Sequence, residues 1–410
     1  MNRESCRLAL DLGTTTLAGR LLGAGGEVLA EGKLPNPQAA LGGDVVRRME
    51  LALDGAGQRL QALLAGGVEA LVGELLSRAG LPKASIAAAA AAGNPAVCHL
   101  LRNLPVEPLL FPPYRPNDPA GSFHDAAPWG LDLPVPLYLF PLVSGYVGGD
   151  LVAFVFSQGP CRPGNMFLDV GTNGEMALFT GERWLCTSVA AGPAFEGGEI
   201  SCGMALENGA VTGVRVRGDV LELKVAGGVS PRGLCGSGLV EAVGAALEGG
   251  LIDRRGRIVQ PDEVPTNLAR YIAETPAGRV LRLYRDAATD LTLSQEDVRR
   301  FQLAKGAVRA GASCLLQKAG VEEGEIGRLV VTGAFGFSLG SEALKRVAML
   351  PANMVDKVRF VPGGALSGVG RFLADPEGPA KVRTLASALR PYPLSGTPAF
   401  EKAFLKSLDF

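Results

Sequence analysis

The chain has 410 residues, with 40 Lys and Arg against 41 Asp and Glu, and its formal net charge at pH 7 is −1. This balance excludes a dedicated nucleic-acid surface and an anionic-membrane surface as the main function. At roughly 100–200 residues per domain, the length predicts two or three globular domains. The most apolar stretch, 133–156, is broken by three prolines and Asp150, so it predicts no spanning helix, and we expect no secretory signal.

Seven cysteines are scattered along the chain, and the closest two are Cys186 and Cys202. This spacing predicts no zinc ribbon, no thioredoxin-like dithiol and no iron–sulfur cluster of the ferredoxin type. An odd number of scattered thiols is typical of a reducing compartment, so we expect the cytoplasm. The two histidines are too few for a histidine metal site, and His99 is expected to pack in the core.

The first part of the chain predicts three strands, at 7–11, 17–22 and 27–30, with a glycine-threonine turn at 13–16. Apolar residues at helical spacing then predict two or three helices within 42–79. A buried strand is expected at 85–92, followed by a short helix that begins near Pro95. The proline-rich run 104–141 predicts an ordered connection.

The same pattern then restarts 158 positions later. A strand at 166–169, a glycine turn at 171–174 and a strand at 175–179 repeat the first hairpin. Further elements are predicted at 211–225 (strand), 239–247 and 298–319 (helices), 329–332 (strand), 343–350 (helix), 358–361 (strand) and 363–374 (helix). The fold class expected is therefore α/β, a duplicated ribonuclease H-like architecture of two lobes around a ligand cleft.

The predicted domain boundaries follow this repeat. Residues 1–143 form the first lobe with the proline-rich connection, and 144–375 form the second lobe with the connecting helices. Residues 376–410 form a C-terminal tail that packs on the lobes.

Both predicted hairpins carry an Asp-x-Gly-Thr motif that suits phosphate chemistry. In the first hairpin, Gly13 lets the backbone approach a phosphate, Thr14 and Thr15 add hydroxyl donors, and Asp11 offers oxygen ligation to Mg²⁺. Taken alone, an ordinary polar hairpin explains this motif equally well. The second copy, which comprises Asp169, Gly171, Thr172 and Asn173, favours two loops that grip one polyphosphate from both sides.

Two more glycine-rich features complete the pattern. The strand at 329–332 ends in Gly333 and Gly336, which could let an adenosine lie against the backbone. The glycines at 144–153 and 363–370 call for a reason such as close helix crossing, because glycine costs up to about 1 kcal/mol inside a helix. We expect these two helices to cross at a hinge between the lobes.

In this order the elements resemble the actin, heat-shock chaperone and sugar-kinase ATPase superfamily (ASKHA), and the resemblance covers nearly the whole chain. Within it, the chain is most similar to the ATP-dependent reductive activators of corrinoid proteins. The segments that carry this likeness are 9–16, 36–38, 43–45, 145–148, 169–175, 191–197, 200–204, 235–239 and 302–307.

The resemblance implies an actin-like ATPase fold and a set of site residues. It places phosphates and Mg²⁺ at the two hairpins, with Asp11 and Asp169 as the metal-binding carboxylates, and adenosine at Gly333 and Gly336. It makes Glu175 and Glu196 the candidates to orient a water near the terminal phosphate, with a purely structural role as the alternative. Cys202 and Cys235 are expected to pack, and Ser237 could cap the helix that follows Cys235.

The resemblance implies an ATPase that helps return the cobalt of a corrinoid protein from Co(II) to Co(I). Such activators carry a ferredoxin domain, whereas this sequence has no cysteine cluster, so we expect a separate low-potential electron donor. The loop 93–97 also departs from the family, with proline and alanine in place of hydroxyl-bearing residues. The alternatives are a small-molecule kinase and a non-redox ATP-gated clamp on a protein. The oligomeric state is left open, with a homodimer as one option.

Overall fold

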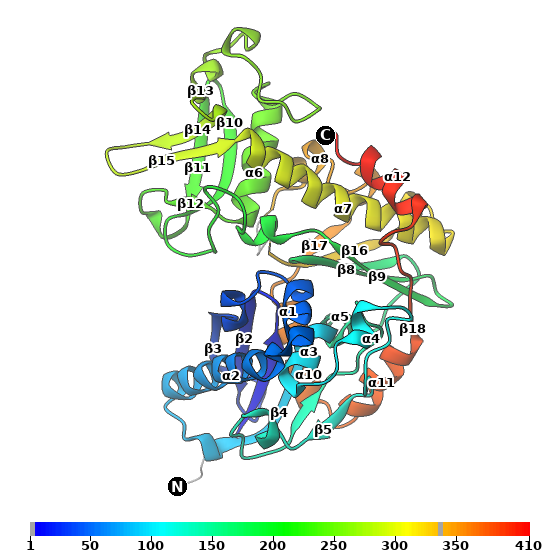
Figure 1. Ribbon diagram of the computed structural model, residues 1–410. Helices are drawn as coiled ribbons and strands as arrows, with labels where there is room; N and C mark the ends of the chain where they lie inside the picture. Colours follow the sequence, from blue (N-terminus) through cyan, green and yellow to red (C-terminus); the bar gives the residue numbers. More distant parts are fainter. Residues whose placement is uncertain (1–4, 335–338) are drawn as a thin grey trace. The chain divides into compact units, whose positions relative to one another are not determined.

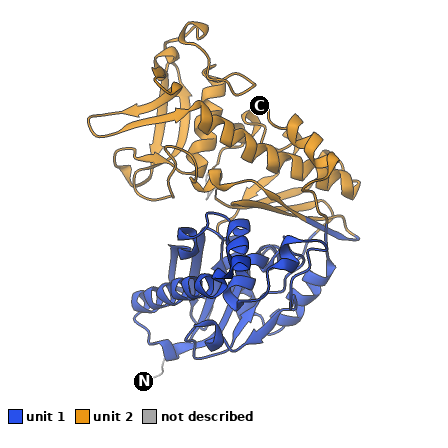
Figure 2. Ribbon diagram, viewed as in Figure 1, with its two compact units in different colours: residues 1–161, 182–186, 363–391 blue, residues 162–181, 187–362, 392–410 orange. Residues whose placement is uncertain are grey.

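The computed structural model describes residues 5–334 and 339–410. These form two compact units, shown in different colours in Figure 2. Unit 1 comprises residues 1–161, 182–186 and 363–391, and unit 2 comprises 162–181, 187–362 and 392–410. The domain boundaries expected after residues 143 and 375 stay predictions.

Unit 1 is built on a six-stranded mixed sheet (Figure 1). The strands are β1 (Cys6–Leu12), β2 (Thr16–Leu22), β3 (Val28–Pro35), β4 (Ile86–Gly93), β5 (Ser122–His124) and β6 (Leu137–Leu139), in the order β3-β2-β1-β4-β6-β5. The first three strands form an antiparallel meander, and β4 pairs parallel to β1. The proline-rich run therefore contributes two short strands to this sheet.

Helices of unit 1 pack on the sheet, and Asp11 lies on the face of β1 opposite to the core that β1 shares with α2. They are α1 (Val45–Leu51), α2 (Gly57–Ala79), α3 (Pro95–Arg102), α4 (Glu107–Leu110), α5 (Gly149–Ser157), α10 (Gly364–Ala374) and α11 (Gly378–Ala388), with a further strand β18 (Leu389–Pro391). Residues 6, 8, 10 and 12 of β1 pack in one core with α2. Because side chains alternate along a strand, Asp11 lies on the opposite face.

The run Val45–Ala79 is long and apolar enough to match a membrane span by length and composition. Core helices pass the same test, and α2 packs Leu64, Val68 and Leu71 against β1 in the core of unit 1.

A second six-stranded sheet has the order β17-β16-β7-β8-β9-β18. Its remaining strands are β7 (Asn165–Val170), β8 (Asn173–Phe179), β9 (Trp184–Ala190), β16 (Arg328–Gly333) and β17 (Val358–Phe360). Strands β7 and β8 are antiparallel, whereas β16 pairs parallel to both β7 and β17. The order β9-β8-β7-β16-β17 thus repeats β3-β2-β1-β4-β6 of unit 1, and the predicted duplication is confirmed.

Unit 2 also contains two three-stranded sheets. One has the order β11-β10-β12, from β10 (Ala210–Arg217), β11 (Val220–Val225) and β12 (Gly233–Leu234). The other is β13-β14-β15, from β13 (Ile272–Thr275), β14 (Gly278–Arg285) and β15 (Asp290–Ser294). The helices are α6 (Gly236–Glu248), α7 (Gln295–Ala319), α8 (Ser341–Arg346), α9 (Ala352–Val355) and α12 (Pro398–Lys406). The prediction gave one strand for 211–225, where the structure has a hairpin.

Helices α5 and α10 pack closely within unit 1. A Cβ added at Gly368 would lie 1.8 Å from the carbonyl oxygen of Ala153, and one at Gly364 would lie 2.4 Å from the Phe154 ring. The predicted close helix crossing is confirmed for Gly364 and Gly368 of α10. It was wrong for the glycines at 145, 148 and 149, where an added Cβ would meet Tyr114, Gly93 and Phe140 and not α10. The hinge role of this crossing stays a prediction.

Candidate functional site

The first Asp-x-Gly-Thr motif forms the turn between β1 and β2. The Gly13 amide donates to the carbonyl of Thr16 at 3.1 Å, and a Cβ at Gly13 would lie 2.5 Å from that same oxygen. Thr14 is buried and Thr15 is half-buried. Glycine is therefore required for the close turn that presents the two threonines.

Three polar side chains from other segments hold this turn. Asn36 donates from Nδ2 to the Gly13 carbonyl at 2.9 Å, and its amide donates to the Thr15 carbonyl at 2.8 Å. Arg48 of α1, which is fully buried, donates from Nη1 to the Thr14 carbonyl at 2.8 Å. Asn94 donates from Nδ2 to Thr14 Oγ1 at 2.9 Å. All three turn carbonyls are thus bonded, which fixes the turn in one conformation.

The loop 93–97 lacks the hydroxyl-bearing residues of the family, and Asn94 accounts for part of this difference. Its Oδ1 accepts a hydrogen bond from the Val97 amide and so caps α3, which has Pro95 in its first turn. The loop therefore contacts the first hairpin through Asn94 rather than through a hydroxyl-bearing residue.

Asp11 has a second carboxylate as a neighbour, Asp150, in the first turn of α5. Burial, together with the negative charge of Asp150, raises the pKa of Asp11 to about 7. Burial raises the pKa of Asp150 to about 6, although its Oδ1 accepts a hydrogen bond from the Leu151 amide at 2.8 Å. Asp11 and Asp150 are half-buried, and among residues 5–334 and 339–410 neither forms an ion pair. Two desolvated carboxylates that repel each other are costly, and a divalent cation between them would remove the repulsion. The residues of unit 1 thus fit a magnesium ion.

The sequence interpretation missed Asp150. Its signal was present, because an acidic residue directly after Gly148 and Gly149 occupies the start of a helix. The glycines around it were explained by helix packing, and the carboxylate was left without a role.

The second Asp-x-Gly-Thr motif forms the turn between β7 and β8 of unit 2. The Gly171 amide donates to the Asn173 carbonyl at 2.9 Å, which closes the turn. The Thr172 carbonyl accepts from the amides of Ala191 and Gly192, and Thr172 Oγ1 donates to Glu196 Oε2 at 2.6 Å. The segment 191–197 singled out in the sequence therefore supports the second hairpin.

Both predicted carboxylates lie near this hairpin. Glu175 is the direct cross-strand partner of Asp169 in the β7–β8 pair, so the two side chains share one face of the sheet. It is largely buried and accepts a hydrogen bond from Ser188 Oγ at 3.2 Å. Glu196 ends the short helix Pro193–Glu196. The structure brings Asp169, Glu175, Thr172 and Glu196 to one hairpin.

Gly333 places the predicted adenosine loop beside Asp169. It ends β16, has a φ of +97°, and a Cβ there would lie 2.2 Å from the Val170 carbonyl oxygen and 2.6 Å from Asp169 Oδ1. The next amide, of Ala334, donates to the same Val170 carbonyl at 2.7 Å. Only glycine fits this backbone approach. Gly336 lies outside the described residues.

The cysteines in the two singled-out loops are packed thiols. Burial raises the pKa of Cys202 to about 12, with the negative charge of Asp297 as a second cause. Cys235 is buried and its Sγ contacts the Val211 carbonyl at 3.3 Å. Among residues 5–334 and 339–410, no three His, Cys, Asp or Glu side chains are grouped to hold a metal ion. Asp11 and Asp150 are only two carboxylates, so a cation bound between them would also be coordinated by a ligand.

Comparison with known proteins gives two family matches that together span nearly the whole chain. Residues 6–159 match the RACo middle region, and residues 164–410 match the C-terminal domain of RACo, the ASKHA domain. A solved structure described as a reductive activator for corrinoid, iron–sulfur protein superposes with a TM-score of 0.92 at 27% sequence identity, over 100% of this chain and 67% of that one.

Two curated relatives are similar in sequence. Corrinoid activation enzyme RamQ of Eubacterium limosum is 28% identical over 425 residues, which cover 98% of this chain and 70% of the relative. The [Co(II) methylated amine-specific corrinoid protein] reductase of Methanosarcina barkeri is 27% identical over 248 residues, 54% of this chain and 41% of the relative. The chain therefore spans only part of the length of each.

Proposed function

Because this chain belongs to the RACo family and has its ASKHA domain, we propose that it is an ATPase that activates a corrinoid protein by supporting the return of its cobalt from Co(II) to Co(I). Its relatives are described as a corrinoid activation enzyme and as a reductase of a Co(II) corrinoid protein. The observation that carries the proposal is the pair of Asp-x-Gly-Thr hairpins, which end equivalent strands in two sheets of the same order.

We propose that Mg-ATP is the nucleotide. Gly13, Thr14 and Thr15 of one hairpin and Gly171, Thr172 and Asn173 of the other would hold the phosphates. Asp11, with Asp150 beside it, and Asp169 would hold the metal ion. Magnesium neutralises phosphate charge when bound. The support comes from the half-buried carboxylate pair, whose pKa values are raised, and from the fixed turn of the first hairpin.

Glu175 and Glu196 are proposed to orient the attacking water. Glu196 is held by the Thr172 hydroxyl, so its position depends on the turn that would bind phosphate. Glu175 shares a face with Asp169, which would couple it to the metal ion. A water-orienting carboxylate acts by position, so both candidates require this fixed geometry.

The redox step needs one electron for each cobalt, since Co(II) plus one electron gives Co(I). We propose that a separate low-potential donor supplies it, and that ATP binding and hydrolysis change the partner's cobalt environment. A tenfold change in the equilibrium constant of a one-electron couple is about 59 mV. ATP can contribute only through its differential affinity for two states of the complex. We place this activity in the cytoplasm.

A spectroscopic assay tests the proposal. A corrinoid protein in its Co(II) state is mixed with this chain, Mg-ATP and a low-potential donor such as titanium(III) citrate, and Co(I) absorbance is followed under anaerobic conditions. Co(I) should form only in the complete mixture. Formation that is equally fast without ATP would remove the activator function, and phosphorylation of a small metabolite in its place would favour a kinase.

A further inference from the structure

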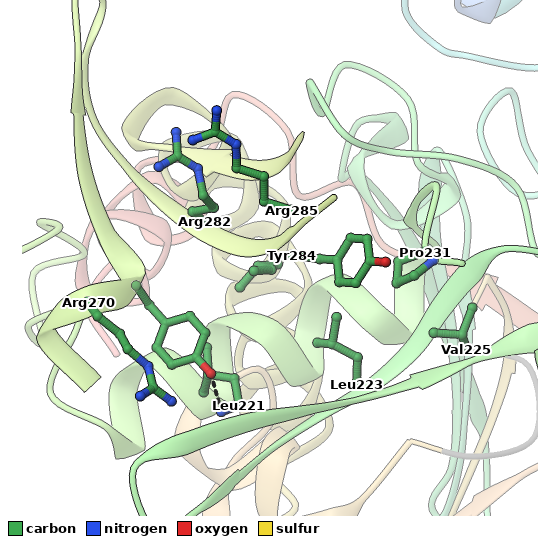
Figure 3. Close-up of a pocket in the computed structure, with 10 residues that line it drawn as sticks. Leu221, Leu223, Val225, Pro231, Arg270, Arg282, Tyr284 and Arg285 are labelled. Carbon is green, nitrogen blue, oxygen red and sulfur yellow. Dashed lines mark hydrogen bonds between the residues drawn. The ribbon is translucent and has the colours of Figure 1, made fainter. Parts of the chain in front are cut away.

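A groove of about 580 Å³ lies in unit 2 between β11 of one three-stranded sheet and β14 of the other (Figure 3). Alternate residues of β11, Leu221, Leu223 and Val225, line one side of it. Tyr284 and Arg285 of β14 lie on the other side. The groove therefore has an aliphatic wall facing an aromatic and cationic one.

Strand β11 is an edge strand, because it has a neighbour in its sheet only on the β10 side. The Leu221 amide points away from β10 and donates to the Tyr271 hydroxyl at 3.0 Å, the contact drawn in Figure 3. Since backbone groups alternate along a strand, the amide of Leu223 points to the same side. In the part of the chain that the structure describes, it has no hydrogen-bond partner. An open edge of this kind can accept another strand.

The charged side chains that line the groove are all cationic, and two carboxylates beside it, Asp286 and Asp290, accept hydrogen bonds from Tyr284 and Arg282. The lining includes three arginines and no carboxylate. Two of them are engaged: Arg282 bonds Asp290 through two contacts of 2.8 and 3.2 Å, and Arg270 donates to the Asp219 carbonyl at 2.9 Å. Arg285 is exposed, and no described residue forms a hydrogen bond or ion pair with its guanidinium. A carboxylate of a ligand could therefore form a salt bridge with the guanidinium of Arg285.

We propose that this groove binds an extended, acidic segment of a protein partner, which adds to the edge of β11 as a further strand. Backbone pairing with Leu223 would supply affinity without regard to sequence. Aliphatic side chains at alternate positions would contact Leu221, Leu223 and Val225, and an acidic side chain would pair with Arg285. The inference goes beyond the proposed function, because it concerns a surface of unit 2 that needs neither nucleotide nor cobalt.

The test uses the full chain and a fluorescein-labelled peptide of eight residues that alternates valine or leucine with glutamate. Fluorescence anisotropy should show saturable binding. A peptide with lysine in place of glutamate should bind at least tenfold more weakly, because it meets Arg285 with like charge. A peptide that is N-methylated on the backbone amides of one edge should bind at least tenfold more weakly, because it cannot pair as a strand.

Two variants of the protein complete the design. Arg285→Glu should weaken binding at least tenfold, whereas Arg359→Glu, an exposed arginine on β17 that does not line the groove, should bind as the wild type does. Leu223→Pro removes the outward amide, a change that edge strands tolerate. It should also weaken binding at least tenfold, with circular dichroism checking that the chain is folded.

A lack of saturable binding would overturn the proposal, and so would equal affinity of the glutamate and lysine peptides. Wild-type affinity in folded Arg285→Glu would do the same. Sedimentation showing a dimer that Arg285→Glu dissociates would assign the groove to a second copy and so reject a partner segment. Mg-ATP titration of the same samples separates these failures from failure of the nucleotide site.

Discussion

The side chain of Asn94 links the start of α3 to the first Asp-x-Gly-Thr hairpin: its Oδ1 accepts from the Val97 amide while its Nδ2 donates to Thr14 Oγ1 at 2.9 Å. One side chain thus stabilises a helix and positions a threonine of the candidate site. Capping and positioning can be separated by substitution, because a cap needs only an acceptor and the contact with Thr14 needs the longer amide.

Asn94→Ala should lower the free energy of unfolding by about 1 kcal/mol, the usual cost of a lost cap, and should also weaken ATP binding. Asn94→Ser keeps a capping oxygen and loses the amide, so it should retain most of the stability and still bind ATP more weakly. Thermal unfolding and calorimetric titration measure the two effects. Equal ATP affinity in all three proteins would show that Asn94 only caps α3.

The raised pKa of Asp11 predicts a pH dependence of stability for the nucleotide-free chain. The carboxyl of Asp11 keeps its proton up to about pH 7 in the folded state, whereas in the unfolded state it releases the proton near its ordinary pKa of 3.8. The contribution of Asp11 to the free energy of unfolding is therefore fully present below pH 3.8 and is lost as the pH rises towards 7. Because a pKa change of one is worth about 1.4 kcal/mol, the loss is on the order of a few kcal/mol.

Urea unfolding of wild type and Asp11→Asn between pH 4 and 8 measures this loss. The difference in stability between the two proteins should shift in favour of the variant as the pH rises. Asp54→Asn, which changes an exposed aspartate of the same unit, serves as the control and should track the wild type. A difference in stability that is independent of pH would contradict the raised pKa of Asp11.

Asp150→Asn tests whether the two carboxylates interact. Removing the charge of Asp150 should lower the pKa of Asp11, because its repulsion is one of the two causes of the raised value. Carbon-13 detected NMR titration of labelled aspartate carboxyls would follow the change. If the pKa of Asp11 is the same in Asp150→Asn as in the wild type, burial alone raises it.

Much of the site could be predicted because its signals are local. Each hairpin carries its aspartate, glycine and threonine within a few positions, next to short apolar strands. Arg48 was not predicted, because a charged residue at helical spacing usually faces solvent. Its burial depends on the Thr14 carbonyl, 34 positions away. The strands β13 to β15 were also missed, since the arginines of β14 interrupt its apolar pattern.

One expectation about α6 was wrong. Ser237 does not cap this helix: Cys235 occupies the cap position but its side chain makes no capping hydrogen bond, and Ser237 Oγ donates to the Thr212 carbonyl at 3.3 Å. Tight packing determines this start, since a Cβ at Gly236 would lie 1.9 Å from the Phe195 carbonyl oxygen. A cap predicted from sequence cannot include such a contact, because Phe195 is distant in the chain. By contrast, His99 is buried as expected, and its Nδ1 lies 2.8 Å from the Pro105 carbonyl.

Gly368→Ala should destabilise the fold by about 1–3 kcal/mol or more, because the added methyl would meet the Ala153 backbone at 1.8 Å. Gly73→Ala, in α2, is the matched control, since a Cβ there has nothing within 4 Å. It should stabilise the chain by about 0.5–1 kcal/mol through helix propensity. Thermal unfolding that moves in the same direction for both variants would contradict the close crossing of α5 and α10.

We expect the purified chain to hold no iron–sulfur cluster, since its closest cysteines are Cys186 and Cys202 and burial raises the pKa of both to about 12. Anaerobic purification, iron and sulfide analysis and a visible spectrum check this. Stoichiometric iron with a band that dithionite bleaches would show that scattered thiols converge on a cluster, and the need for a separate donor would fall.

We propose that both hairpins bind one nucleotide, and calorimetric titration with Mg-ATP measures this binding. The wild type should bind one ATP per chain. Asp11→Asn and Asp169→Asn should each weaken Mg²⁺-dependent binding at least tenfold while remaining folded, and the exposed changes Asp54→Asn and Asp262→Asn should have no effect. Wild-type affinity in either hairpin variant would contradict the claim.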